Sequence, residues 1–187
     1  MAQINGAVEC RLDDEWYEVV TVGALLLQHW DLNGCLFGVD NYGGFAPLFP
    51  DRGVPPDCSA AVARLTEDLD ANEAHASWVS WRELSEVSWS ESATARDRRV
   101  TQSVIGDDGA VTVVTKWLHK AGFEWVEQVL GEDPTVELTC GDFRFCRAIL
   151  KRSDALVDTE FPLVMRLMEC LAGRFGVERV RLIVWFD

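Results

Sequence analysis

The sequence lacks any long apolar run and any recognisable export signal. Its longest candidate, residues 22–27, is the size of a strand, whereas a membrane-spanning helix needs about 18 apolar residues or more. The first ten residues have neither the basic region nor the apolar segment of a signal peptide. We therefore expect a cytoplasmic protein that does not span a membrane.

Lysine is absent before Lys116, and no two cysteines have the CxxC spacing of a metal or redox site. The glycine-rich residues 43–53 therefore lack the lysine that a phosphate-binding loop usually carries at its mouth. The six cysteines are scattered along a chain long enough to bury its own core, so we expect free and mostly buried thiols. We expect neither a metal site nor another cofactor.

Basic residues are scarce in the first half of the chain. Residues 1–91 hold 16 acidic and 4 basic residues, whereas residues 92–187 hold 15 and 13. Such an acidic half repels phosphates, so no nucleic-acid partner is expected. The acidity either keeps the protein in solution, attracts a partner with a basic face or mimics a polyanion. The basic residues of the second half are expected either to form one positive patch, to be solvated, or to pair with the acidic half. They include Arg96, Arg98, Arg99, Arg144, Arg147, Lys151 and Arg152.

Hydrophobic patterning predicts a mixture of hairpins and helices. Residues 6–12 and 16–22 form one expected hairpin, and residues 100–105 and 111–117 form another across a Gly-Asp-Asp-Gly turn. A helix is expected to begin at Asp158 and to end at Gly173 or Gly176, and the apolar residues 180–186 predict a strand buried on both faces. We therefore predict one α+β domain over residues 1–187, with a mostly antiparallel sheet, a central C-terminal strand and covering helices.

Residues 41–89 are the most unusual part of the chain. Glycine and proline exclude a helix or central strand from residues 41–56, which follow an expected turn at Asn33-Gly34 and a short strand at 35–39. A helix is expected over residues 60–69 and another over 81–87, the second opened by a capping box of Ser80 and Glu83. The pattern thus predicts a loop–helix–loop surface, because long ordered loops often carry function.

Within this block, Arg52 is a candidate for binding a carboxylate or phosphate. The alternative is an ion pair with a neighbouring acid such as Asp51 or Asp57. Cys58 and His75 are the Cys/His pair of the block, and a helix N-terminus at Cys58 would lower the pKa of its thiol. The alternative is a buried thiol and a histidine bonded to the backbone.

Tryptophans are dense at the end of the block, where Trp78, Trp81 and Trp89 lie within twelve residues. Aromatic side chains are enriched at interfaces and in ligand pockets, but they also fill cores. Both interpretations are open for these three residues.

The block resembles a family of small bacterial and phage proteins. In that family an Arg-Gly-x-Pro-x-Asp-x-Ser segment precedes an acidic helix and a His segment that ends in Ser-Trp. Eight residues of this chain match: Arg52, Gly53, Pro55, Asp57, Ser59, His75, Ser77 and Trp78. The resemblance implies that the block is shared within the family, and it implies no activity.

The leading hypothesis is a non-enzymatic binding protein that presents residues 41–89 to a protein or a small ligand. Its expected binding residues are Arg52, Asp57, His75, Trp78 and Trp81. By analogy, the size and acidity fit a bacterial or phage conflict factor, such as an immunity, antitoxin or anti-defence protein. One alternative is an enzyme that uses Cys58 and His75 with Arg52 and Asp57. Another is a structural homo-oligomer with a tryptophan interface.

Overall fold

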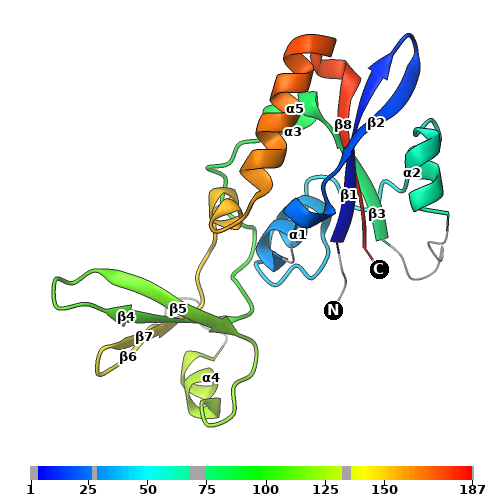
Figure 1. The fold of residues 1–187 in the computed structure, drawn as a ribbon. Coiled ribbons are helices and arrows are strands. Elements are labelled where there is room, and N and C mark those ends of the chain that lie inside the picture. Colours follow the sequence, from blue (N-terminus) through cyan, green and yellow to red (C-terminus); the bar gives the residue numbers. More distant parts are fainter. Residues whose placement is uncertain (1–3, 27–28, 68–74, 132–135, 187) are drawn as a thin grey trace.

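The computed structural model describes residues 4–26, 29–67, 75–131 and 136–186. They form two four-stranded antiparallel sheets and five α-helices, which confirms the predicted α+β class (Figure 1). No helix among these residues is long and apolar enough to cross a membrane. That residues 1–187 make up one domain stays a prediction.

The main sheet has the strand order β2-β1-β8-β3. Its strands are β1 (Ile4–Leu12), β2 (Glu15–Thr21), β3 (His75–Ser80) and β8 (Val180–Phe186). The C-terminal strand β8 lies between β1 and β3 and is buried along its whole length, as its apolar sequence predicted. The expected first hairpin is also present, because Asp13 and Asp14 adopt the positive φ angles of 46° and 70° that a tight hairpin turn requires.

Helices cover both faces of the main sheet. They are α1 (Trp30–Phe37), α2 (Ala60–Leu65), α3 (Trp81–Ser85) and α5 (Phe161–Phe175), with short 3-10 turns η1 (Gly23–Leu25), η2 (Arg152–Leu156) and η3 (Val177–Arg179). Figure 1 shows α1 and α5 on one side and α2 on the other. Alternate residues of β8 therefore enter two cores, with Leu182 against Phe161 and Met168 of α5, and Ile183 against Val62 of α2.

The expected strand at residues 35–39 is wrong, because residues 35–37 form the end of α1 and Gly38 caps it. Gly34 lies in the interior of the helix instead of forming a turn with Asn33. A Cβ on Gly34 would lie 2.7 Å from the Cα of Asn41, so glycine is needed for the close approach of the following loop. The helix ends at Gly38, whose left-handed φ of 81° is the usual signal for a helix C-terminus.

The expected loop before Ser80 is also wrong, because residues 75–80 form the edge strand β3. Val79 enters the core with Leu182, while Trp78 faces the α2 side of the sheet. Two expected helices are confirmed in shorter form. Ser59 caps α2, which ends at Leu65, and the predicted end at residue 69 lies outside the described residues. The capping box of Ser80 opens α3.

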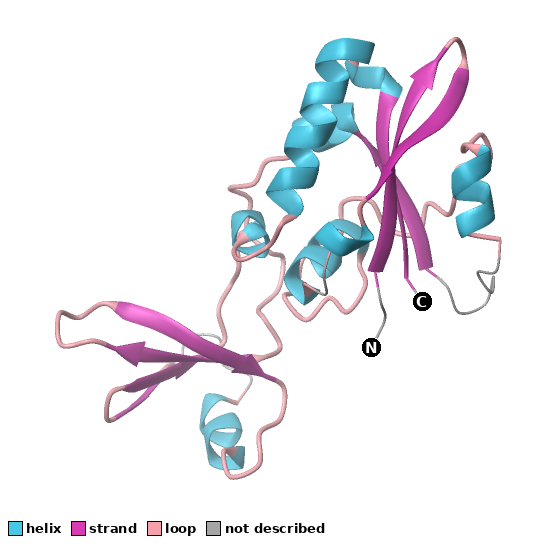
Figure 2. Ribbon diagram, viewed as in Figure 1, coloured by secondary structure: helices cyan, strands magenta, loops and turns pink. Residues whose placement is uncertain are grey.

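The second sheet has the order β5-β4-β7-β6 and its own core. Its elements are β4 (Val100–Ile105), β5 (Val111–Trp117), β6 (Leu138–Cys140) and β7 (Phe143–Cys146), with helix α4 (Glu124–Leu130). Figure 2 shows α4 beside this sheet. Val126 and Leu130 of the helix pack on Val100, Trp117 and Phe145 of the strands.

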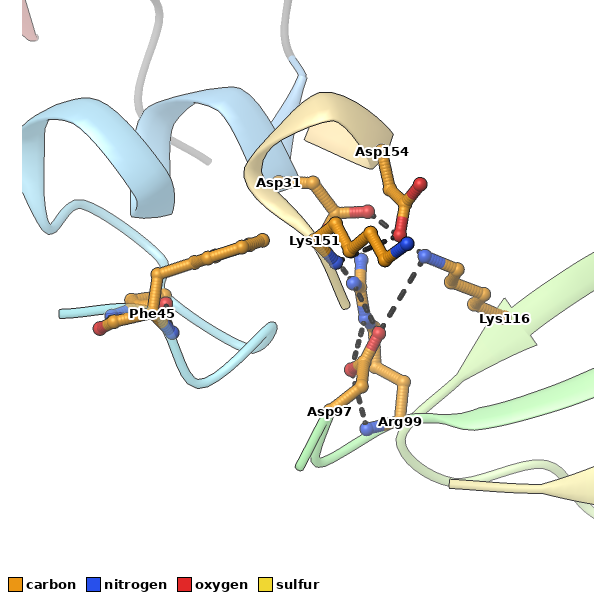
Figure 3. A network of polar contacts seen from close by, with 8 residues as sticks. Asp31, Phe45, Asp97, Arg99, Lys116, Lys151 and Asp154 are labelled. Carbon is orange, nitrogen blue, oxygen red and sulfur yellow. Dashed lines mark hydrogen bonds and ion pairs between the residues drawn. The ribbon is translucent and has the colours of Figure 1, made fainter. Parts of the chain in front are cut away.

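An ion network joins helix α1, which packs on the main sheet, to the second sheet (Figure 3). Arg99 at the start of β4 binds the carboxylate of Asp97 through Nε at 2.8 Å and Nη2 at 2.7 Å, and it also binds Asp31 of α1. Lys116 of β5 reaches Asp31 at 2.9 Å. Arg99 of the basic second half thus pairs with Asp31 of the acidic first half, which is one of the alternatives expected from the sequence.

Candidate functional site

A pocket of about 550 Å³ opens on the α2 side of the main sheet. We call it the tryptophan pocket; its walls include Trp16, Pro55, Pro56, Trp78, Glu178 and Arg181. Ser80 of β3 is paired with Arg181 of β8, and Arg181 is paired with Glu9 of β1. Three neighbouring strands therefore place their side chains together at the end of the sheet that carries the β1–β2 turn.

An ion triad lies at the pocket wall, in which Arg181 and Glu9 are buried and Asp57 is exposed. The guanidinium of Arg181 donates from Nε to Glu9 at 2.8 Å and from Nη1 to Asp57 at 2.8 Å. Glu9 is completely buried, and its second oxygen accepts the backbone N–H of Ser59 at 2.7 Å. Buried charges are stable only when they are paired and hydrogen-bonded, so Arg181 and Glu9 fix residues 55–59 onto the sheet through Asp57 and Ser59.

Trp16 closes one side of this triad. The guanidinium carbon of Arg181 lies 3.8 Å from the Trp16 ring centroid, which is close stacking, and the indole N–H donates to Asp57 at 2.9 Å. The hydrogen bond from Arg181 holds the pKa of Asp57 below its ordinary value, and Trp16 adds to this effect. Asp57 is therefore a carboxylate with a fixed orientation.

The Arg52 side chain makes its contacts within the chain. Its guanidinium lies 2.9 Å from Glu83 and stacks over Phe49 and Trp78, at 5.0 Å and 5.2 Å from the ring centroids. An ion pair of Arg52 with an acidic residue was expected, but the predicted partners Asp51 and Asp57 are wrong, because Arg52 pairs with Glu83. Burial raises the pKa of Glu83, but hydrogen bonds from Ser80 and Arg52 outweigh it and lower this pKa overall. Arg52 thus braces the Trp78 wall of the pocket.

Cys58 and His75 are not hydrogen-bonded to each other in the described structure. The His75 ring lies on the exposed side chain of Asp51, at 3.2 Å. Burial raises the pKa of the Cys58 thiol, so the expected lowering at the helix N-terminus is wrong. The Ser77 hydroxyl has a structural partner, because it donates to the carbonyl of Phe49. These residues do not present an activated nucleophile.

Trp81 faces away from the tryptophan pocket. Together with Trp89 it lines a separate groove of about 470 Å³ between α3 and α5. The two nearest tryptophans of the block, Trp78 and Trp81, therefore belong to different surfaces. Of the expected binding residues, the structure brings Asp57 and Trp78 into the pocket, supports its wall with Arg52, and leaves His75 and Trp81 elsewhere.

Sequence reasoning missed Glu9, Trp16, Glu178 and Arg181. One signal was available for Arg181, since it is the lone charge in an otherwise apolar strand that was expected to be buried. A buried arginine requires an acidic partner, and Glu9 stands in an apolar segment of another strand. No comparable signal marks Trp16 or Glu178.

The thiols differ from the expected burial. Cys10 and Cys35 are buried, Cys58 and Cys146 are half-buried, and Cys140 and Cys170 are exposed. In the described part of the chain, no three His, Cys, Asp or Glu side chains gather as metal ligands would.

Alkylation should distinguish these thiols. Burial raises the pKa of Cys58, and it raises the pKa of Cys10 to about 11, while the thiolate is the reactive form. We expect iodoacetamide to modify Cys170 roughly ten times faster than Cys58 near neutral pH. Peptide mass spectrometry over a time course measures both rates. Equal rates at Cys58 and Cys170 would contradict this expectation and favour the enzyme hypothesis.

No protein-family model, curated protein or solved structure matches the chain. The resemblance to a bacterial and phage family stays a prediction.

Proposed function

We propose that this is a non-enzymatic binding protein whose tryptophan pocket takes a basic side chain of a protein partner. The observation that carries the proposal is the combination of two indole walls with surplus carboxylates in one pocket of about 550 Å³. Cavities of a few hundred cubic ångströms are the usual size for specific binding sites.

The charges around the pocket favour a cation. Arg181 is shared by Glu9 and Asp57, so this triad keeps a net negative charge. Arg82 is likewise shared by Glu86 and Glu178. Both arginines are thus more than neutralised, and the β1–β2 turn beside Trp16 adds further acids. A guanidinium or ammonium group entering here would approach a negative potential.

The indole rings supply the second part of the recognition. Trp16 and Trp78 already stack with the protein's own guanidinium groups, at 3.8 Å for Arg181 and 5.2 Å for Arg52. Tryptophan is the strongest cation–π partner among the side chains, and arginine is its most frequent ligand. An arginine-bearing segment of a partner therefore fits both the chemistry and the charge of the pocket.

Nuclear magnetic resonance of the indole N–H groups tests this proposal. A short arginine–glycine peptide is expected to shift the Trp16 and Trp78 signals in a saturable manner, while those of Trp81 and Trp89 stay in place. The Glu178→Lys variant should weaken the binding about tenfold or more, because it reverses a charge at the pocket wall.

Glu169→Lys is the matched control, since Glu169 lines the separate groove and carries the same charge. It should leave the affinity nearly unchanged, and a glutamate–glycine peptide should not bind. Equal losses in the two variants would show diffuse attraction to an acidic surface. That result, or an absence of shifts at Trp16 and Trp78, would overturn the proposal.

A further inference from the structure

The tryptophan pocket has room for more than one basic side chain. Its volume of about 550 Å³ lies in the range that holds a drug-sized ligand, which is larger than the side chain of one arginine or lysine. Arg82 and Glu178 form a charged part of the wall. An apolar part is formed by four rings, which belong to Trp16, Pro55, Pro56 and Trp78. The residues that flank the bound cation therefore meet mainly rings.

Polar groups beside these rings are already hydrogen-bonded within the chain. The two oxygens of Asp57 accept from Trp16 at 2.9 Å and from Arg181 at 2.8 Å. The Ser80 hydroxyl donates to the Glu83 carboxylate at 2.8 Å and accepts the Glu83 backbone N–H at 3.2 Å. A ligand N–H placed against the rings would lose its water and find its acceptors occupied, which costs free energy.

Trp78 and Glu178 keep polar atoms free for a ligand. The indole N–H of Trp78 makes no hydrogen bond to a described residue, and the protein does not enclose it. Glu178 binds Arg82 through Oε1, while its Oε2 has no partner in the described part of the chain. The pocket thus offers a donor beside the rings and a carboxylate oxygen at the charged wall.

We infer that the pocket takes a proline-rich segment of the partner, which carries the arginine and binds in the polyproline II conformation. This inference rests on the proposed function and adds the residues that flank the cation. Proline has no N–H, so it places no unpaired donor against the rings. A polyproline II backbone has no internal hydrogen bonds, so its carbonyls are free to accept the Trp78 N–H. Segments of this kind dock in grooves lined by aromatic side chains.

Isothermal titration calorimetry with two capped peptides tests the inference. The peptides are Pro-Pro-Arg-Pro-Pro and Gly-Gly-Arg-Gly-Gly, which carry the same charge. A residue before proline is restricted to extended backbone, so the proline peptide loses less conformational entropy on binding. Its rings also bury apolar surface against the pocket. We therefore expect the proline peptide to have a dissociation constant about tenfold lower or more.

The Trp78→Phe variant tests the indole N–H. Phenylalanine keeps an aromatic ring in the wall and removes the donor. The variant should bind the proline peptide roughly three- to tenfold more weakly, which corresponds to the loss of one hydrogen bond. Trp89→Phe is the matched control, because Trp89 lines the separate groove, and it should leave the affinity unchanged. Circular dichroism should show that both variants are folded.

The outcomes separate this inference from the proposed function. A glycine peptide that binds as tightly as the proline peptide would overturn the inference and leave the proposed function in place. Equal affinities of the Trp78→Phe and Trp89→Phe variants for the proline peptide would also overturn it. If neither peptide binds the native chain, the proposed function fails and the inference fails with it.

Discussion

Replacement of Arg181 by methionine is expected to lower the free energy of unfolding by about 3–5 kcal/mol. The substitution keeps most of the apolar stem and removes the charge that Glu9 and Asp57 share. Glu9 is completely buried, so its carboxylate would remain in the core with no cation beside it. Urea unfolding, followed by tryptophan fluorescence, measures the loss.

Two further variants separate lost pairing from lost packing. Arg179→Met changes an exposed arginine two residues away, and it should alter stability by less than about 0.5 kcal/mol. Glu9→Gln combined with Arg181→Met should recover more than half of the loss. Glutamine removes the unpaired charge and still offers an oxygen to Ser59 N–H, and uncharged replacements of buried ion pairs are often well tolerated. A double variant as unstable as Arg181→Met would contradict this account.

The Arg181→Met variant should also differ from the native chain in how its stability depends on acidic pH. Hydrogen bonding from Arg181 keeps the pKa of Asp57 below its ordinary value of 3.8. A carboxyl group with a lowered folded pKa contributes stability above its ordinary pKa, and this contribution is lost as the pH falls through the folded pKa. Without Arg181 that contribution shrinks, so the stability of the variant should decline less steeply in this acidic range.

Local signals in the sequence were sufficient for elements whose cause is local. The Asp13-Asp14 turn, the Ser80 capping box and the apolar strand β8 all appear where the pattern placed them. The predictions were wrong where a segment distant in the sequence determines the local structure. Residues 75–80 form a strand because β8, a hundred residues later, offers an unpaired edge. Asn33-Gly34 would usually indicate a turn, but Gly34 lies inside a helix, where glycine is needed because Asn41 approaches it closely.

The candidate site follows the same division. Asp57 and Trp78 could be found from the density of unusual residues in one block. Their counterparts come from β1, β2 and β8, which are separated from the block by tens of residues or more, and sequence spacing carries no information on that contact. A lone arginine in a buried strand was the accessible clue, because its burial requires an acid nearby.

Replacement of Arg99 by methionine is expected to cost a similar amount, about 3–5 kcal/mol, at the junction of the two sheets. Asp97 is completely buried, and two nitrogens of Arg99 hold its carboxylate (Figure 3). After the substitution its nearest cation is Lys116, at 3.6 Å, which also binds Asp31. Arg98→Met is the control, because the neighbouring Arg98 is exposed.

The location of this network predicts which part of the chain responds. Asp31 belongs to α1 beneath the main sheet, whereas Lys116 belongs to β5 of the second sheet, and the two sheets have separate cores. Hydrogen exchange should therefore rise in β4, β5 and β7 of the Arg99→Met variant, while β1 and β8 keep their protection. Equal acceleration in β8 would show that the network stabilises the whole chain and not the junction. Unchanged exchange in β4 would show that the separate core of the second sheet is sufficient to hold it.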